Sequence, residues 1–174
     1  MKKLIILAAV VFGFAATSFA QATGNAKADA TASILASVTI TNNNGFDFGS
    51  IYSSVLGGTV DLKADNSRVP TGVQLGTTAG KAAKFTVVGS GDGSPHIGIM
   101  YTQSPVTLTG PGTAMTLNGI FAEEGGLTKI SGSSLDLDVN GQAILFMGGT
   151  LNLNPQQKAG TYTNASAVTV TVAY

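Results

Sequence analysis

The sequence predicts an all-β protein built as an antiparallel β-sandwich. Three observations lead to this fold class. Apolar and polar residues alternate with a period of two along many short segments, which is typical of strands with one buried face. Clusters of Gly, Asn, Pro and Ser separate these segments at regular spacing. Thr and Val, which favour the pleated surface of a sheet, are abundant. A closed barrel is the alternative architecture.

Charge and cysteine content restrict the function. The chain has 174 residues, with nine basic and nine acidic side chains, and charged residues make up only 10% of it. No basic cluster is available to bind phosphates, so we expect no nucleic-acid partner. The absence of cysteine excludes disulfides, thiol catalysis and thiolate metal sites. Stability must therefore come from the core and the strand ladders.

The first twenty residues have the layout of a secretory signal peptide. Two lysines follow the first Met, an apolar run covers residues 4–16, and Ser18-Phe19-Ala20 supplies small residues three and one before Gln21. We expect cleavage after Ala20. A retained membrane anchor is the alternative, although the apolar run is short for a span. The mature protein is expected to be exported to the periplasm, the cell surface or the medium, with no membrane span of its own.

Residues 21–32 are predicted to form an N-terminal extension, and residues 33–174 the sandwich domain. The even positions from Ala22 to Ile40 are small or apolar, whereas most odd positions are polar. As a single strand these nineteen residues would span about 63 Å. Ordinary strands have only about 3–10 residues. We therefore expect this part either to be a flexible leader or to pair with another chain.

The other alternating segments predict the strands of the domain. They lie at residues 46–51, 59–64, 69–75, 83–87, 97–101, 106–109, 115–121, 135–139, 143–147 and 151–153, and along the C-terminal stretch from Tyr162 to Tyr174. Gly110-Pro111-Gly112 predicts a turn. Asn140-Gly141 is typical of a two-residue hairpin turn. Gly148-Gly149 is expected to bend the chain between two strands.

One segment resembles a metal site. Asp136-x-Asp138-x-Asn140-Gly141 matches the opening of a calcium loop, whose twelfth position requires a bidentate Glu. That position is Met147 here. The alternating Leu137 and Val139 favour a strand that enters a turn, so we predict no metal.

The candidates for catalysis are weaker. Gly76 to Lys81 is one residue shorter than a phosphate loop, and Ala82 replaces its Ser or Thr. His96 is the only histidine. The adjacent pair Glu123-Glu124 would point to opposite faces of a strand. We therefore predict that the protein is not an enzyme and that it has no catalytic residue and no cofactor.

Three segments resemble the motifs of a known family. Phe46 to Ile51 resembles F-x-F-G-x-I, and Gly148 to Leu153 resembles G-G-T-L-x-V. The ending from Ala159 to Tyr174 resembles A-G-x-Y followed by V-T-V-x-Y. Together they are similar to a family of exported bacterial domains of uncharacterised function, over residues 30–174. That family is similar in turn to spore-coat-U-like proteins and chaperone–usher pilins.

The resemblance implies an immunoglobulin-like, pilin-like sandwich that lacks one strand. In such fibres the N-terminal extension of the next subunit fills the gap by β-augmentation. The implied partners are copies of the chain or related subunits, and a periplasmic chaperone. The residues expected at subunit contacts lie in the extension and the C-terminal strand: Ala26, Ala28, Ala30, Ala32, Ile34, Val168, Val170, Val172 and Tyr174.

We therefore expect a structural subunit of a fimbria-like surface fibre, with a role in adhesion. The alternative is a monomeric adhesin or module that binds glycan or a surface partner. Tyr52, Tyr101 and Phe121 are its candidate contact aromatics, although a place in the core is the favoured prediction for each of them.

Overall fold

The computed structural model describes residues 24–34, 37–89, 96–125, 128–130 and 134–174. The chain divides into two units, Met1–Ile34 and Leu35–Tyr174. In the first unit, residues 24–34 form neither helix nor strand, and all of them are exposed. The predicted signal peptide lies outside the described residues.

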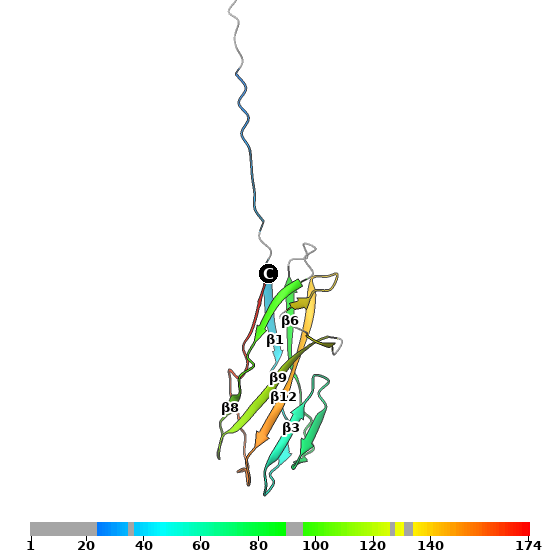
Figure 1. The fold of residues 1–174 in the computed structure, drawn as a ribbon, viewed down its shortest axis with the longest axis vertical. Coiled ribbons are helices and arrows are strands. Elements are labelled where there is room, and N and C mark those ends of the chain that lie inside the picture. The colour runs from blue at the N-terminus through cyan, green and yellow to red at the C-terminus, as the bar shows by residue number, and fades with distance from the viewer. Residues whose placement is uncertain (1–23, 35–36, 90–95, 126–127, 131–133) are drawn as a thin grey trace, which may run out of the picture. The chain divides into compact units, whose positions relative to one another are not determined.

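The second unit is an all-β, antiparallel sandwich, and its large sheet is built around β12 (Gln142–Leu153). One edge of β12 is shared by two strands: the first half pairs with β6 (Ala83–Gly89) and the second half with β3 (Gly58–Leu62). The other edge pairs with β9 (Met115–Glu124) along most of its length. Figure 1 shows β12 and β9 crossing the middle of the domain.

Four shorter strands extend this sheet. On one side, β1 (Val38–Asn44) pairs with β6 and β4 (Arg68–Thr71) pairs with β3. On the other side, β8 (Val106–Leu108) and β10 (Thr128–Lys129) both pair with β9. The β8–β9 pair confirms the turn predicted at Gly110-Pro111-Gly112.

A smaller sheet forms the second layer. It has the order β11 (Ser134–Asp136), β7 (His96–Tyr101), β13 (Val170–Ala173). A separate pair joins β2 (Ile51–Tyr52) to β5 (Gln74–Leu75). The described part of the chain contains no helix, and it therefore contains no helical segment that could cross a bilayer.

The core lies between the two layers, as the period-two pattern predicts. Inward residues of neighbouring strands stand opposite one another: Val60, Leu151 and Leu117 form one row across β3, β12 and β9. The largest fully buried side chains come from both layers and are Val60, Leu62, Val87, Ile97, Leu117, Leu135, Leu145, Met147 and Leu151.

The predicted bend at Gly148-Gly149 is wrong, because β12 continues through it as one strand. Both glycines serve close packing instead. Gly148 lies on the outer face, where an added Cβ would overlap the ring of Phe121. Gly149 lies on the inner face, where a Cβ would stand 2.9 Å from Leu117 Cδ1. The irregularity is in the partner strand, where a β-bulge is formed with Gly119 at a φ of 56°.

The hairpin predicted at Asn140-Gly141 is wrong as well, although the turn forms. The amide of Asp138 donates to the carbonyl of Gln142 at 2.8 Å, and Gly141 has a φ of 72°. However, β11 and β12 belong to different sheets, so the turn links the two layers. The edges of β12 pair with β6, β3 and β9 instead.

Candidate functional site

A groove opens on one side of the sandwich, where the two layers end in β1 and β13. These two edge strands lie side by side (Figure 1). Within the described residues β1 pairs only with β6, and β13 only with β7. The segments that follow β1 and precede β13, residues 45–53 and 157–168, form the rims of the groove.

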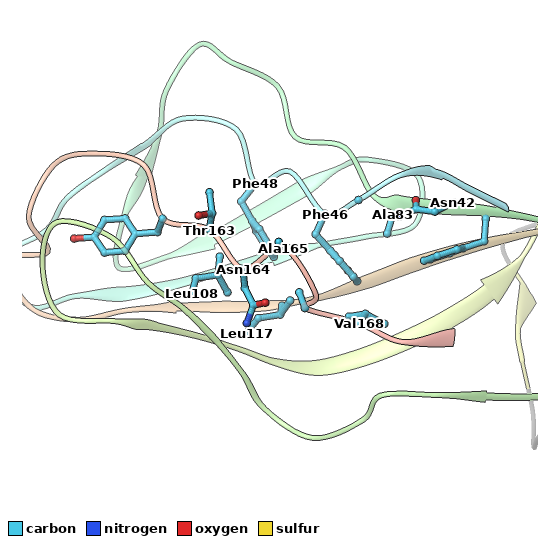
Figure 2. Close-up of a pocket in the computed structure, with 14 residues that line it drawn as sticks. Asn42, Phe46, Phe48, Ala83, Leu108, Leu117, Thr163, Asn164, Ala165 and Val168 are labelled. Carbon is cyan, nitrogen blue, oxygen red and sulfur yellow. The ribbon is translucent and has the colours of Figure 1, made fainter. Parts of the chain in front are cut away.

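The groove consists of two adjoining hollows of about 200 Å³ and about 510 Å³. Figure 2 shows the first, with Phe46 and Phe48 on one side and Thr163, Asn164 and Ala165 on the other. The side chains common to both hollows are Phe46, Phe48, Leu108, Tyr162 and Thr163. The hollows are therefore one continuous site.

At Asp47 the first rim is joined to the domain by a two-residue bridge. The amide of Asp47 donates to the carbonyl of Lys81 at 2.9 Å, and Lys81 returns the bond at 2.7 Å. Because successive residues of an extended chain direct their main-chain groups to opposite sides, those of Phe46 point away from Lys81. The rings of Phe46 and Phe48 stack with their centroids 6.5 Å apart.

Arg68 holds the same rim from β4. Its Nη1 donates to the carbonyls of Phe48 at 2.7 Å and Ser50 at 3.2 Å, and its Nη2 to that of Gly76 at 3.5 Å. Gly49 has a φ of 64°, and a Cβ there would stand 2.2 Å from the carbonyl oxygen of Thr78 and 2.7 Å from the guanidinium of Arg68. The glycine in the F-x-F-G motif therefore permits the backbone and Arg68 to approach closely.

The second rim is attached in the same way. Thr163 and Thr109 exchange two main-chain hydrogen bonds of 2.9 and 3.0 Å. The main-chain groups of Tyr162 and Asn164 then point away from Thr109. Within the residues that the structure describes, the main-chain groups of Phe46, Tyr162 and Asn164 make no hydrogen bond. Both rims therefore carry main-chain groups that are available to another strand.

The floor of the groove is apolar. It is formed by residues of β6, β8, β9 and β12: Ala83, Phe85, Leu108, Met115, Leu117, Leu151 and Leu153. The only ionisable carboxylate and amine in its lining are those of Asp47 and Lys158. Such a site binds through main-chain hydrogen bonds and apolar burial rather than through charge.

The ionisable residues gather elsewhere, near β11. Nδ1 of His96 lies 2.5 Å from Oδ1 of Asp136. Burial, with a further contribution from Asp136, raises the pKa of Glu124. Hydrogen bonds from the amides of Gln142 and Asn140 lower the pKa of Asp138. These bonds hold the turn, and the described residues contain no group of three ligands able to hold a metal ion.

The predicted contact residues are distributed unevenly. Val168 lines the groove, whereas Val170 and Val172 are half-buried in β13 against the core. Tyr174 is 46% exposed. The C-terminal strand is shorter than predicted, because Tyr162 to Val168 lies outside β13. The predicted residues of the extension are all exposed: Ala26, Ala28, Ala30, Ala32 and Ile34.

The three aromatic residues considered for ligand contact do not meet in one site. Tyr52 lines the larger hollow and is 61% exposed. Tyr101 packs against the core from β7, and Phe121 lies on the outer face of β9. The main groove residues, Phe46, Phe48 and Tyr162, were not chosen as site residues from the sequence. Their presence in the F-x-F-G and A-G-x-Y motifs was the only available indication.

The fold and the groove define an antiparallel β-sandwich with an accessible edge between its layers. Residues 38–174 match the family described as a domain of unknown function, DUF4402. The chain therefore belongs to the DUF4402 family, and the match covers nearly all of the second unit. No curated protein and no solved structure matches the chain.

Proposed function

We propose that this protein is a non-catalytic structural subunit of a surface fibre, and that it self-associates by strand exchange. In this assembly an extended segment of a second copy lies in the groove. One observation supports the proposal. In the described residues, both rims have main-chain groups that make no hydrogen bond, and an apolar floor lies between the rims. A peptide that adds to a sheet needs both features, because the main chain provides affinity and side-chain pockets provide register.

The energetics favour a peptide strand as the occupant. Each new main-chain hydrogen bond contributes about 0.5–1.5 kcal/mol. Each apolar side chain that leaves water adds roughly 25 cal/mol for every Å² it buries. Insertion would also cover the half-exposed rings of Phe46 and Tyr162. An inserted strand would thereby complete the layer that the rims leave open.

The extension of a second copy is the proposed donor. Its described part, residues 24–34, is exposed and free of secondary structure, and would span roughly 36 Å as a strand. Small side chains at Ala26, Ala28, Ala30 and Ala32 leave room for close approach of two backbones. Ile34 is the one large apolar side chain among them and is 95% exposed.

This assembly is the one used by chaperone–usher pilins, to which we expect the family to be similar. A periplasmic chaperone would then cover the groove before assembly. The protein would be exported by its signal peptide and act at the cell surface. Related subunits with a similar extension would be equally suitable donors.

The test is a denaturing gel of the exported protein with and without boiling. We expect a ladder of multimers in the unheated sample that collapses to monomer on heating. Deletion of residues 21–34 should abolish the ladder and leave a folded monomer by circular dichroism. A single monomer band in the unheated full-length protein would refute strand exchange.

Matched tryptophan substitutions test whether the groove receives the donor. Ala165 lines the groove, whereas its neighbour Ser166 does not. Ala165→Trp should fill the smaller hollow and reduce the multimers at least tenfold, while Ser166→Trp should leave them unchanged. Equal ladders in both variants would place the subunit contact elsewhere.

A further inference from the structure

The outer face of the large sheet carries a row of polar side chains across five strands. Consecutive members stand opposite each other in the register of β4, β3, β12, β9 and β8. They are Thr71, Thr59, Asn152, Thr116 and Thr107. Four strand spacings of about 4.8 Å give the row a length of about 19 Å.

A second row runs parallel to the first, two residues along each strand. Its members on β3, β12 and β9 are Asp61, Thr150 and Asn118. The hydroxyl of Thr150 donates to Asp61 Oδ1 at 2.6 Å. The ring of Phe121 follows on β9, above Gly148. The face therefore has two polar rows and an aromatic side chain beside them. It lies on the opposite side of the sheet from the inward row of Val60, Leu151 and Leu117.

The threonines of the first row are preorganised for hydrogen bonding. In the described part of the chain their four hydroxyls make no hydrogen bond within the protein. A threonine side chain in a strand has few χ1 rotamers, so little entropy is lost when its hydroxyl is bound. Each hydroxyl can both donate and accept. A partner with many hydroxyl groups would satisfy the row.

The chemistry of the face distinguishes between classes of partner. Asp61 is the only charged side chain in the two rows, and no cation is present to bind phosphate. Val69, opposite Asp61 on β4, and Phe121 on β9 are the large apolar side chains beside the rows, and two separate side chains are too few for the buried centre of a protein interface. A neutral polyhydroxyl chain matches the length, charge and hydrogen-bonding capacity of the rows.

We propose that this outer face is a binding site for a neutral, extended polysaccharide. The sugar hydroxyls would exchange hydrogen bonds with Thr59 and Thr116 and with the amide of Asn152, and a sugar ring would stack beside Phe121. The site is separate from the groove and does not depend on strand exchange. It would give each subunit its own adhesive surface.

The experiment is a pull-down of the full-length protein with microcrystalline cellulose, chitin and insoluble mannan, with polygalacturonate as the acidic comparison. The wild type should be depleted from solution by at least one neutral polymer and not by the acidic one. Thr59→Val combined with Thr116→Val removes two hydroxyls and keeps the branched shape. This double variant should bind at least tenfold less.

Thr39→Val combined with Thr41→Val is the matched control, because both residues are exposed threonines of β1, away from the rows. The control and the groove variant Ala165→Trp should bind as the wild type does. Equal melting temperatures of the two double variants would show that both are folded. The proposal is overturned if no neutral polymer binds, if the acidic polymer binds equally well, or if both double variants lose binding alike.

Discussion

The two halves of β12 have similar inner faces but different coverings. In the closed half, residues 142–147, Leu145 and Met147 are fully buried and neither lines the groove. In the open half, residues 149–153, Leu151 is 2% and Leu153 is 9% exposed, and both line the larger hollow. Each rim that covers the open half has one isolated two-residue bridge, and the first rim also contains the two-residue pair of β2 with β5. Apolar side chains can therefore be shielded from water with only short strand pairs above them.

The largest expected effect comes from truncating one leucine in each half. Leu145→Ala should lower the free energy of unfolding by about 3–5 kcal/mol, because it leaves a cavity in a rigid core. Leu153→Ala should cost about 2 kcal/mol, since it only enlarges a hollow that already exists. Urea unfolding of the two variants measures this difference. Equal losses would mean that the rims pack as tightly as the smaller sheet.

An intermediate effect is expected at Arg68, which replaces strand pairing in the open half. Arg68→Met leaves the carbonyls of Phe48 and Ser50 without a charged donor and should cost about 1.5–3 kcal/mol. Hydrogen exchange should become faster for the amides of residues 46–52 and stay unchanged in β7. An unchanged exchange rate in the rim would show that the bridge at Asp47 is sufficient. Arg68→Lys should recover part of the loss.

The smallest effect concerns ionisation near the closed half, at Glu124 and Asp138. Folding raises the pKa of Glu124 above its ordinary value of 4.5, so its contribution to stability is full below that pH and is lost as pH rises through the raised value. Glu124→Gln should match the wild type at pH 4. At pH 7 it should be more stable by a few tenths of a kcal/mol.

Asp138 has the opposite sign. Its lowered pKa adds stability above its ordinary value of 3.8, and this is lost as pH falls through the lowered value. Asp138→Asn should therefore lower the melting temperature at pH 7 and have less effect in acid. Melting curves between pH 2 and 7 test both variants. Parallel pH profiles would show that neither carboxyl is coupled to folding.

The predicted strands are confirmed where apolar and polar residues alternate within the segment itself. The strands at 83–87, 97–101 and 115–121 lie within β6, β7 and β9, because one buried face specifies them locally. The bend predicted at Gly148-Gly149 is wrong because glycine has two uses. Glycine can permit a bend, but here the missing side chains permit Phe121 and Leu117 to pack against the strand.

The sequence by itself determined the all-β class, most of the strands and which residues face inward, since these follow from a period of two and from turn chemistry. Only the tertiary structure decided which strands pair. It also decided that β11 and β12 separate into different layers and that two aromatic motifs distant in sequence face each other across a groove. The physical reason is that the alternation of apolar and polar residues specifies which face of the sheet a side chain occupies. It does not specify which strands lie beside it. Neighbours are chosen by the packing of the whole sheet.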